Sequence, residues 1–190
     1  MKYAEGSAKI TEYRRQIAAI RQKMRETQLA VEPQQVDDYE FRTTEGSIRL
    51  SQLFGKHKDV IFIHNMGTSC PSCTMWADGY NGIHHHVASR AAFVVSSPDT
   101  PDVQRKFAAS RGWTFPMVSH FGTTFAADMG YTSSKGGWLP GISVFQRQGN
   151  GIVRVSDARF SPGDDFCAVW HMFDMLPDGA GDWSPKKQYP

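Results

Sequence analysis

The chain has 190 residues, enough for one domain with a hydrophobic core and too few to expect two full domains. Its formal net charge is +2, from 21 basic and 19 acidic residues, so the composition gives no argument for binding nucleic acid or a membrane surface. No apolar stretch approaches the roughly 20 residues of a membrane span, and the N-terminus lacks the apolar core of a signal peptide. We therefore expect a cytoplasmic protein.

The first predicted element is a helix over residues 7–30, in which apolar side chains recur every three or four positions. This stripe consists of Ile10, Tyr13, Ile17, Ile20 and Met24. It predicts either a surface helix that packs on its own domain or a helix that pairs with a second copy of the chain in a homodimer. Pro33 ends the helix, so we expect an N-terminal helical extension of residues 1–35.

Strands and helices alternate through the middle of the chain. The predicted elements are strands at 39–43 and 47–50, a helical turn at 51–55, a strand at 60–65, a helix at 71–90 with a break at Gly79 or Gly82, a strand at 92–96, a helix at 101–111 capped by Gly112, a short strand at 115–119 and a helical turn within 121–131. This alternation predicts parallel strands joined by right-handed crossovers.

A hairpin and a helix close the predicted domain. Strands at 141–146 and 152–155 flank a turn that contains two glycines, and a last helix covers residues 164–176. Residues 178–190 contain proline and glycine, and we expect a loose tail there. Because the hairpin requires antiparallel pairing, the sequence predicts one α/β domain over residues 36–177, with a mixed sheet and helices on both faces.

Two cysteines, Cys70 and Cys73, stand between the strand at 60–65 and the helix that follows it. Pro71 is favoured at the first helical position, which makes Cys70 the N-cap of the helix. The positive end of a helix lowers the pKa of a thiol placed there. Two cysteines three positions apart on a first helical turn share one face and can bond to each other. The pattern therefore predicts a redox-active dithiol, with Cys70 as the nucleophile and Cys73 as the resolving cysteine.

Other uses of the cysteine pair remain open. A structural zinc site needs four ligands, and His64, Cys167 and the run His84–His86 are the residues that it would have to recruit. Three consecutive histidines on a helix point in different directions and cannot together chelate one ion, so we expect no metal. The pair could also be two inert buried thiols. Cys167 is interpreted as a third, structural thiol in the core.

Pro140 leads into the strand at 141–146 and would lie beside the dithiol if the sheet closes as predicted. A cis peptide at this position would hold Leu139 extended, so that its backbone groups could bind a substrate chain. An ordinary turn proline is the alternative. Trp76, three residues after the second cysteine, is expected in the core or in the wall of the same groove.

With these residues in place, the chain resembles thioredoxin-fold proteins of the thiol-disulfide oxidoreductase kind over about residues 39–160. The matching features are a hairpin before the first core strand, the segment Cys70–Cys73 after that strand, and Pro140 at the place of the cis-proline. The stretches 93–96 and 115–119 are similar to the peroxiredoxin-like branch of the fold. More closely, the chain resembles a bacterial family of unknown function whose members are described as predicted dithiol-disulfide oxidoreductases. The segments that carry this resemblance are 53–54, 70–79, 112–116 and 125–130.

The resemblance implies a thioredoxin-like three-layer sandwich with an extra N-terminal helix and a C-terminal helix. It also implies a thiol-disulfide oxidoreductase that needs no cofactor and acts on thiols or disulfides of proteins or small molecules. Two positions depart from the patterns of known relatives. Thioredoxins carry a tryptophan where this chain has Ser69, and peroxiredoxins carry Thr or Ser where it has Gly67. A thiol peroxidase is therefore the second hypothesis, and a non-catalytic binding module is the third.

Overall fold

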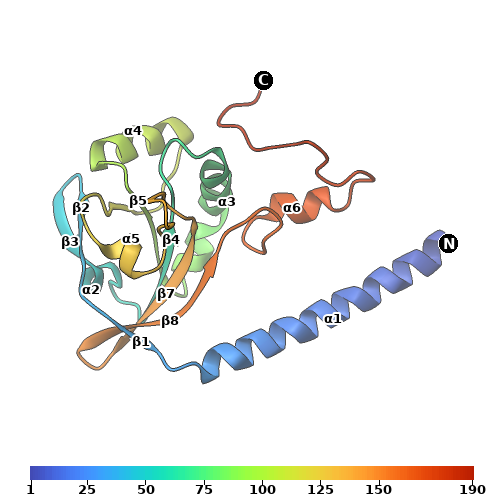
Figure 1. Ribbon diagram of the computed structural model, residues 1–190, viewed down its shortest axis with the longest axis horizontal. Coiled ribbons are helices and arrows are strands. Elements are labelled where there is room, and N and C mark those ends of the chain that lie inside the picture. The colour runs from blue at the N-terminus through green and yellow to red at the C-terminus, as the bar shows by residue number, and fades with distance from the viewer. The chain divides into compact units, whose positions relative to one another are not determined.

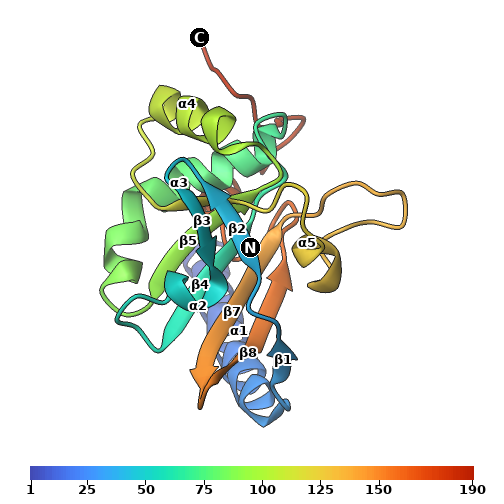
Figure 2. The same cartoon turned by 90° about the vertical axis from the view of Figure 1, so that its left-hand side faces the viewer.

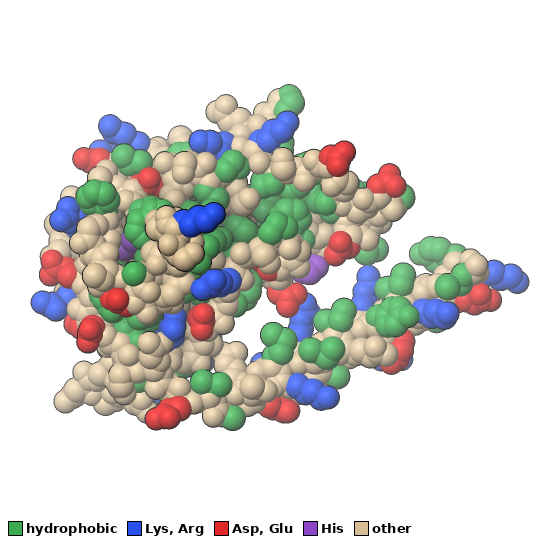
Figure 3. All heavy atoms as spheres, in the orientation of Figure 1, with side chains coloured by type: hydrophobic (Ala, Val, Ile, Leu, Met, Phe, Trp, Pro, Cys, Tyr) green, Lys and Arg blue, Asp and Glu red, His purple; other side chains and the backbone are tan.

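The computed structural model describes residues 1–190, which divide into two compact units, Met1–Gln34 and Gln35–Pro190. The first unit consists mainly of helix α1 (Tyr3–Ala30), as the sequence predicts, and none of its residues is buried. All five side chains of the predicted apolar stripe are exposed, as the hydrophobic side chains along this helix in Figure 3 show. An exposed apolar stripe of this length is typical of a surface that packs against another surface. Both the helix that packs on its own domain and the homodimer stay predictions.

An eight-stranded mixed sheet runs through the fold, in the order β1-β8-β7-β4-β5-β6-β2-β3. Its strands are β1 (Gln34–Val36), β2 (Glu40–Thr43), β3 (Gly46–Arg49), β4 (Asp59–His64), β5 (Ala92–Ser97), β6 (Met117–Ser119), β7 (Gly141–Gln148) and β8 (Gly151–Arg159). The neighbours β4, β5 and β6 are parallel, whereas β7 is antiparallel to β4 and to β8. The crossovers and the closing hairpin therefore pair as the sequence predicts, and only the short β1 has no counterpart in the prediction.

Helices cover both faces of the sheet (Figures 1 and 2). They are α2 (Leu50–Leu53), α3 (Pro71–Ala88), α4 (Pro101–Arg111), α5 (Phe125–Asp128) and α6 (Ala168–Phe173). Successive residues of β4 point to opposite faces of the sheet. Phe62 therefore belongs to the core on one face, which includes residues of α2 and α5. Ile63 belongs to the core on the other face, which includes residues of α3, α4 and α6. The three layers are those of the thioredoxin-like fold. No helix has the length and apolar character needed to cross a lipid bilayer.

Helix α3 continues through Gly79 and Gly82, where the sequence predicts a break. A glycine inside a helix costs roughly 1 kcal/mol relative to alanine. Burying Trp76 and Tyr80 of the same helix against the sheet outweighs this cost, because a fully buried large apolar side chain contributes about 1.5–3 kcal/mol. The predicted break is therefore wrong, and the helix presents one unbroken face to the sheet.

The last helix, α6, is shorter than predicted and begins at Ala168 rather than at residue 164. The side chain of Asp164 accepts hydrogen bonds from the backbone N–H groups of Ser161 and Phe166, at 2.9 Å each. These bonds stabilise a turn before the helix. An aspartate side chain that binds nearby backbone N–H groups competes with the backbone hydrogen bonds of a helix, so the helix begins later than predicted. The prediction of a helix over 164–176 is wrong at both ends.

Candidate active site

Cys70 is the N-cap residue of α3, and Pro71 occupies its first turn, as predicted. The backbone N–H of Cys73 donates a hydrogen bond to the Cys70 sulfur at 3.0 Å, and the two sulfur atoms lie 2.6 Å apart. Both residues are free thiols. Cys70 is 8% exposed and Cys73 is 2% exposed. The first turn of α3 thus holds two thiols in direct contact, with Cys70 the less buried of them.

The two thiols have widely separated pKa values. The hydrogen bond from the Cys73 thiol, followed by backbone N–H groups of Cys73 and Ser72, lowers the pKa of Cys70 to about 7, and burial opposes this shift. The same hydrogen bond and burial raise the pKa of Cys73 far above that of an ordinary thiol. Near neutral pH the first proton therefore leaves Cys70, and Cys73 keeps its own proton while it stabilises the thiolate.

This separation predicts the pH dependence of alkylation. Because the thiolate is the nucleophile and its pKa is about 7, the rate of Cys70 alkylation by iodoacetamide should fall about tenfold per pH unit below pH 7 and level off above it. Mass spectrometry of the labelled peptide between pH 5 and pH 10 measures this profile. In the Cys73→Ala variant the side-chain donor is lost, so the midpoint should move to higher pH. An identical profile in that variant would contradict the assigned cause.

A short loop ahead of α3 is held in one conformation by two polar side chains. The Asn65 side chain accepts from the Gly67 N–H at 2.8 Å and donates to the Cys73 carbonyl at 3.4 Å. The Asp99 carboxylate accepts from the Thr68 N–H at 2.9 Å. Gly67 has a φ of 98°, and a Cβ there would lie 2.9 Å from the Asp99 carboxylate. A Thr or Ser is therefore strained at the position where peroxiredoxins carry one.

Sequence reasoning missed both of these polar residues. Asn65 is followed two residues later by Gly67, a pattern that is typical of an Asx turn. This pattern could have identified Asn65 from the sequence. Asp99 carries no comparable signal, because it reaches the loop from the end of β5, 31 residues away in the sequence. Its role becomes visible only when the parallel pairing of β4 and β5 brings their carboxyl ends together.

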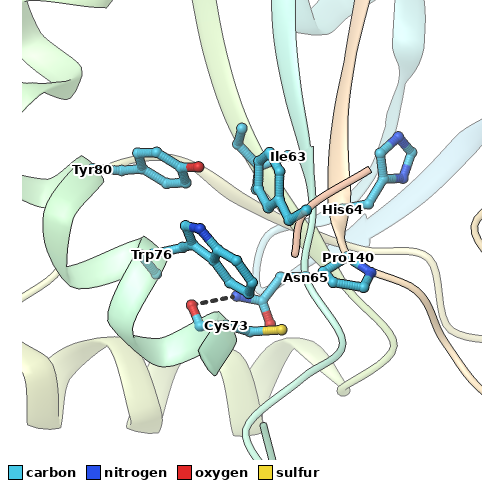
Figure 4. Close-up of a pocket in the computed structure, with 9 residues that line it drawn as sticks. Ile63, His64, Asn65, Cys73, Trp76, Tyr80 and Pro140 are labelled. Atoms are coloured by element: carbon cyan, nitrogen blue, oxygen red, sulfur yellow. Dashed lines mark hydrogen bonds between the residues drawn. The ribbon is translucent and has the colours of Figure 1, made fainter. Parts of the chain in front are cut away.

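Trp76, Pro140 and Cys73 line one small pocket at the dithiol (Figure 4). The close-up shows the Trp76 ring on the α3 side of the pocket and Pro140 on the opposite side, near the start of β7. His64 also lines this pocket. The structure thus brings together two of the three residues predicted to bind substrate and the predicted resolving cysteine.

Leu139 does not line this pocket, because it packs against the core on the other face of the sheet. The protein has no cis peptide bond, so the predicted cis peptide before Pro140 is wrong. The Leu139 N–H donates to the Tyr131 carbonyl at 2.9 Å, and the Pro140 carbonyl accepts from the Phe160 N–H at 3.0 Å. These bonds hold the trans form, which is also the intrinsically favoured form. They also occupy two backbone groups that a substrate chain would need.

Of the histidines considered as metal ligands, His64 is buried at the pocket and the run His84–His86 lies on the outer part of α3. Burial lowers the pKa of His64 well below its usual range, and its Nε2 lies 2.9 Å from the Ser143 hydroxyl. His64 is therefore neutral near pH 7. In the run His84–His86, the Nδ1 of His84 lies 3.2 Å from the Asn81 carbonyl oxygen. No group of three or more His, Cys, Asp or Glu side chains is arranged to hold a metal ion.

A protein-family model described as "Bacterial protein of unknown function (DUF899)" matches residues 5–189 of the chain. The chain belongs to this family. The match spans both structural units and includes the dithiol. No curated protein matches the chain. Membership therefore carries no activity with it.

Solved structures with the same fold include several proteins of the peroxiredoxin kind. Reduced Prx3 from Vibrio vulnificus, in complex with H₂O₂, is 15% identical, with 70% of this chain and 87% of that chain covered and a TM-score of 0.56. The peroxidoxin BcpB from Mycobacterium tuberculosis is 24% identical, with 72% and 88% covered and a TM-score of 0.54. A PrxQ mutant from Xylella fastidiosa is 14% identical, with 69% and 87% covered and a TM-score of 0.53. At these identities the likeness establishes the thioredoxin-like fold.

Proposed function

We propose that the protein is a thiol-disulfide oxidoreductase in which Cys70 is the nucleophile and Cys73 resolves the mixed disulfide. The observation that carries this proposal is the contact between the two sulfur atoms, 2.6 Å apart on the first turn of α3. The separated pKa values and the greater exposure of Cys70 support its role as the attacking thiol. A thiol donor would return the oxidised pair to the dithiol.

The exchange proceeds in two steps. The Cys70 thiolate attacks one sulfur of a substrate disulfide, forms a mixed disulfide and expels the other half of the substrate as a thiolate, which takes a proton. Once Cys70 is consumed, Cys73 no longer stabilises an anion, and it loses its proton to the departing group. The Cys73 thiolate then attacks the Cys70 sulfur and expels the second half as a thiolate, which takes up from solvent the proton that Cys70 released when it ionised. The substrate gains two electrons and two protons, and the protein holds a Cys70–Cys73 disulfide.

Substrate contacts are proposed at the small pocket beside Cys73. Trp76 and Pro140 line it from opposite sides, and the Trp76 indole N–H donates to Asp164 at 3.4 Å, which orients the ring. We include these two side chains as substrate-binding residues. Leu139 is not included, because its backbone N–H is already bonded within the fold. Proteins or small molecules that carry thiols or disulfides are the proposed partners.

A thiol peroxidase is the second candidate, and the peroxiredoxin folds among the solved structures favour it. In that reaction the Cys70 thiolate attacks a peroxide oxygen, a proton allows water to leave, and a sulfenic acid forms. Cys73 condenses with it, releasing a second water and forming the same disulfide. The loop argues against this candidate, because the positive φ of Gly67 and its close approach to the Asp99 carboxylate disfavour the Thr or Ser of peroxiredoxins at this position.

The two candidate activities are distinguished by measuring kcat/KM for a disulfide and for a peroxide with the same thiol donor. We expect kcat/KM with a disulfide such as oxidised glutathione to exceed kcat/KM with H₂O₂ by about 100-fold, since the loop ahead of Cys70 carries Gly67 in place of the Thr or Ser of peroxiredoxins. Both rates are followed by consumption of dithiothreitol, with protein-free reactions that contain donor and substrate as the control. Peroxide turnover equal to disulfide turnover would overturn the primary proposal. Inactivity toward both substrates would contradict both enzymatic hypotheses and favour the third, a non-catalytic binding module.

A further inference from the structure

A second and larger cavity, of about 480 Å³, lies between α3, α6 and the segment after α6, and it shares the lining residues Trp76 and Tyr80 with the dithiol pocket. Ile83 of α3, Val169 and Phe173 of α6, and Trp183 form much of its wall. Figure 3 shows hydrophobic side chains gathered over the region of α6. The volume falls within the range of about 300–1,000 Å³ that is typical of small-molecule sites.

The C-terminal segment that forms one wall is held in place at several points. The Trp183 ring contacts the Trp170 and Phe173 rings edge-on, with centroids 5.6 Å and 4.8 Å apart. The Lys187 carbonyl accepts a hydrogen bond from the Arg111 guanidinium at 2.6 Å, and its ammonium group donates to the Thr68 carbonyl at 3.3 Å. This wall therefore depends on specific contacts with α4, α6 and the loop ahead of the dithiol, although the segment has no regular secondary structure.

The charges around the cavity favour an acidic ligand. Asp78, the one carboxylate in the wall, is paired with the Arg111 guanidinium and accepts from the Trp113 indole N–H at 2.8 Å. Lys186 is the one cation in the wall. The hydroxyl oxygen of Tyr189, another lining residue, accepts from the Lys186 backbone N–H at 3.1 Å, which leaves the hydroxyl hydrogen available to a ligand.

We propose that this cavity binds a small amphiphile with an apolar body and a single acidic group, of the medium-chain carboxylate class. The apolar body lies against Ile83, Phe173 and Trp183, where its burial removes apolar surface from water. The carboxylate pairs with the Lys186 ammonium group and accepts from the Tyr189 hydroxyl. The site does not require the dithiol chemistry, so it stands or falls separately from the proposed function.

Cys167 lines the cavity and supplies a direct readout. The chain has three cysteines, so the Cys70→Ser/Cys73→Ser double variant leaves Cys167 as its only thiol. Decanoate, used below its micelle concentration, is the probe. We expect saturating decanoate to slow alkylation of Cys167 by N-ethylmaleimide about tenfold, because the ligand covers the sulfur. Titration calorimetry with the unmodified protein should give one site per chain.

Three comparisons test the acid group and the location. We expect Lys186→Gln to weaken decanoate binding about fivefold, the order expected from one partly exposed ion pair. Lys106→Gln, a charge-matched change outside the wall, should leave binding unchanged. Val169→Trp should fill the cavity and abolish binding, with an unchanged circular dichroism spectrum showing that the variant is folded. Equal binding of decylamine, or unchanged binding in Lys186→Gln, would overturn the acidic class. An unchanged rate of Cys167 alkylation at saturating decanoate would overturn the site.

Discussion

The Cys70→Ser variant is expected to lose thiol-disulfide exchange by about 1000-fold or more. Serine keeps the size and the N-cap hydrogen bond but has no accessible anion near neutral pH, whereas the Cys70 pKa of about 7 makes a large fraction of thiolate available. Cys73 cannot substitute for it, because Cys73 is 2% exposed and its burial raises its pKa even when the Cys70 thiolate is absent. Initial rates with oxidised glutathione and dithiothreitol measure the loss.

Two further variants separate the roles of the cysteines. Cys73→Ser should still attack a disulfide once and then stop at a mixed disulfide on Cys70, which mass spectrometry of the intact protein detects. Cys167→Ser removes the third thiol, which lies outside the dithiol pocket, and should retain the full exchange rate. Full activity in Cys70→Ser, or loss of activity confined to Cys167→Ser, would contradict the assignment of the nucleophile.

Gly141→Ala is expected to produce the largest loss of stability, about 3 kcal/mol or more. A Cβ at this position would lie 2.3 Å from a ring carbon of Tyr131 and 2.5 Å from the Ala158 carbonyl oxygen. The carbonyl belongs to β8, and Tyr131 is held by a 2.8 Å hydrogen bond from its hydroxyl to the Ile142 carbonyl. Neither neighbour can move away without breaking sheet pairing. For a chain of this size the melting midpoint should fall by about 10 °C.

The matched control for this substitution lies in α3. Gly79 and Gly82 are helical, and a Cβ at either position meets no atom within 4 Å. Gly79→Ala and Gly82→Ala should therefore stabilise the protein by up to about 1 kcal/mol each, through the helix propensity of alanine. Urea denaturation followed by circular dichroism compares all three variants. A Gly141→Ala variant as stable as the unsubstituted protein would show that the Tyr131 ring is not held against the strand.

Features with strong local signals are predicted correctly from the sequence. The Pro71 that follows Cys70 indicates the N-cap, and the structure places the cap there. Gly112 is predicted to end the helix before it, and it has the left-handed conformation, with a φ of 66°. In both cases the deciding interactions lie within a few residues of each other in the chain. Predictions that depended on weaker local signals, such as the break in α3 and the cis peptide before Pro140, are wrong.

The sequence by itself determined the elements, the mixed sheet and the position of both cysteines on one helical turn, because backbone propensity, capping and apolar periodicity act between near neighbours. Only the tertiary structure decided that Asp99 holds the loop ahead of Cys70, that Leu139 faces the other core, and that a cavity opens beside Cys167. These features depend on strand register and on packing between segments that lie tens of residues apart in the sequence. Such contacts leave no local sequence pattern from which they could be predicted.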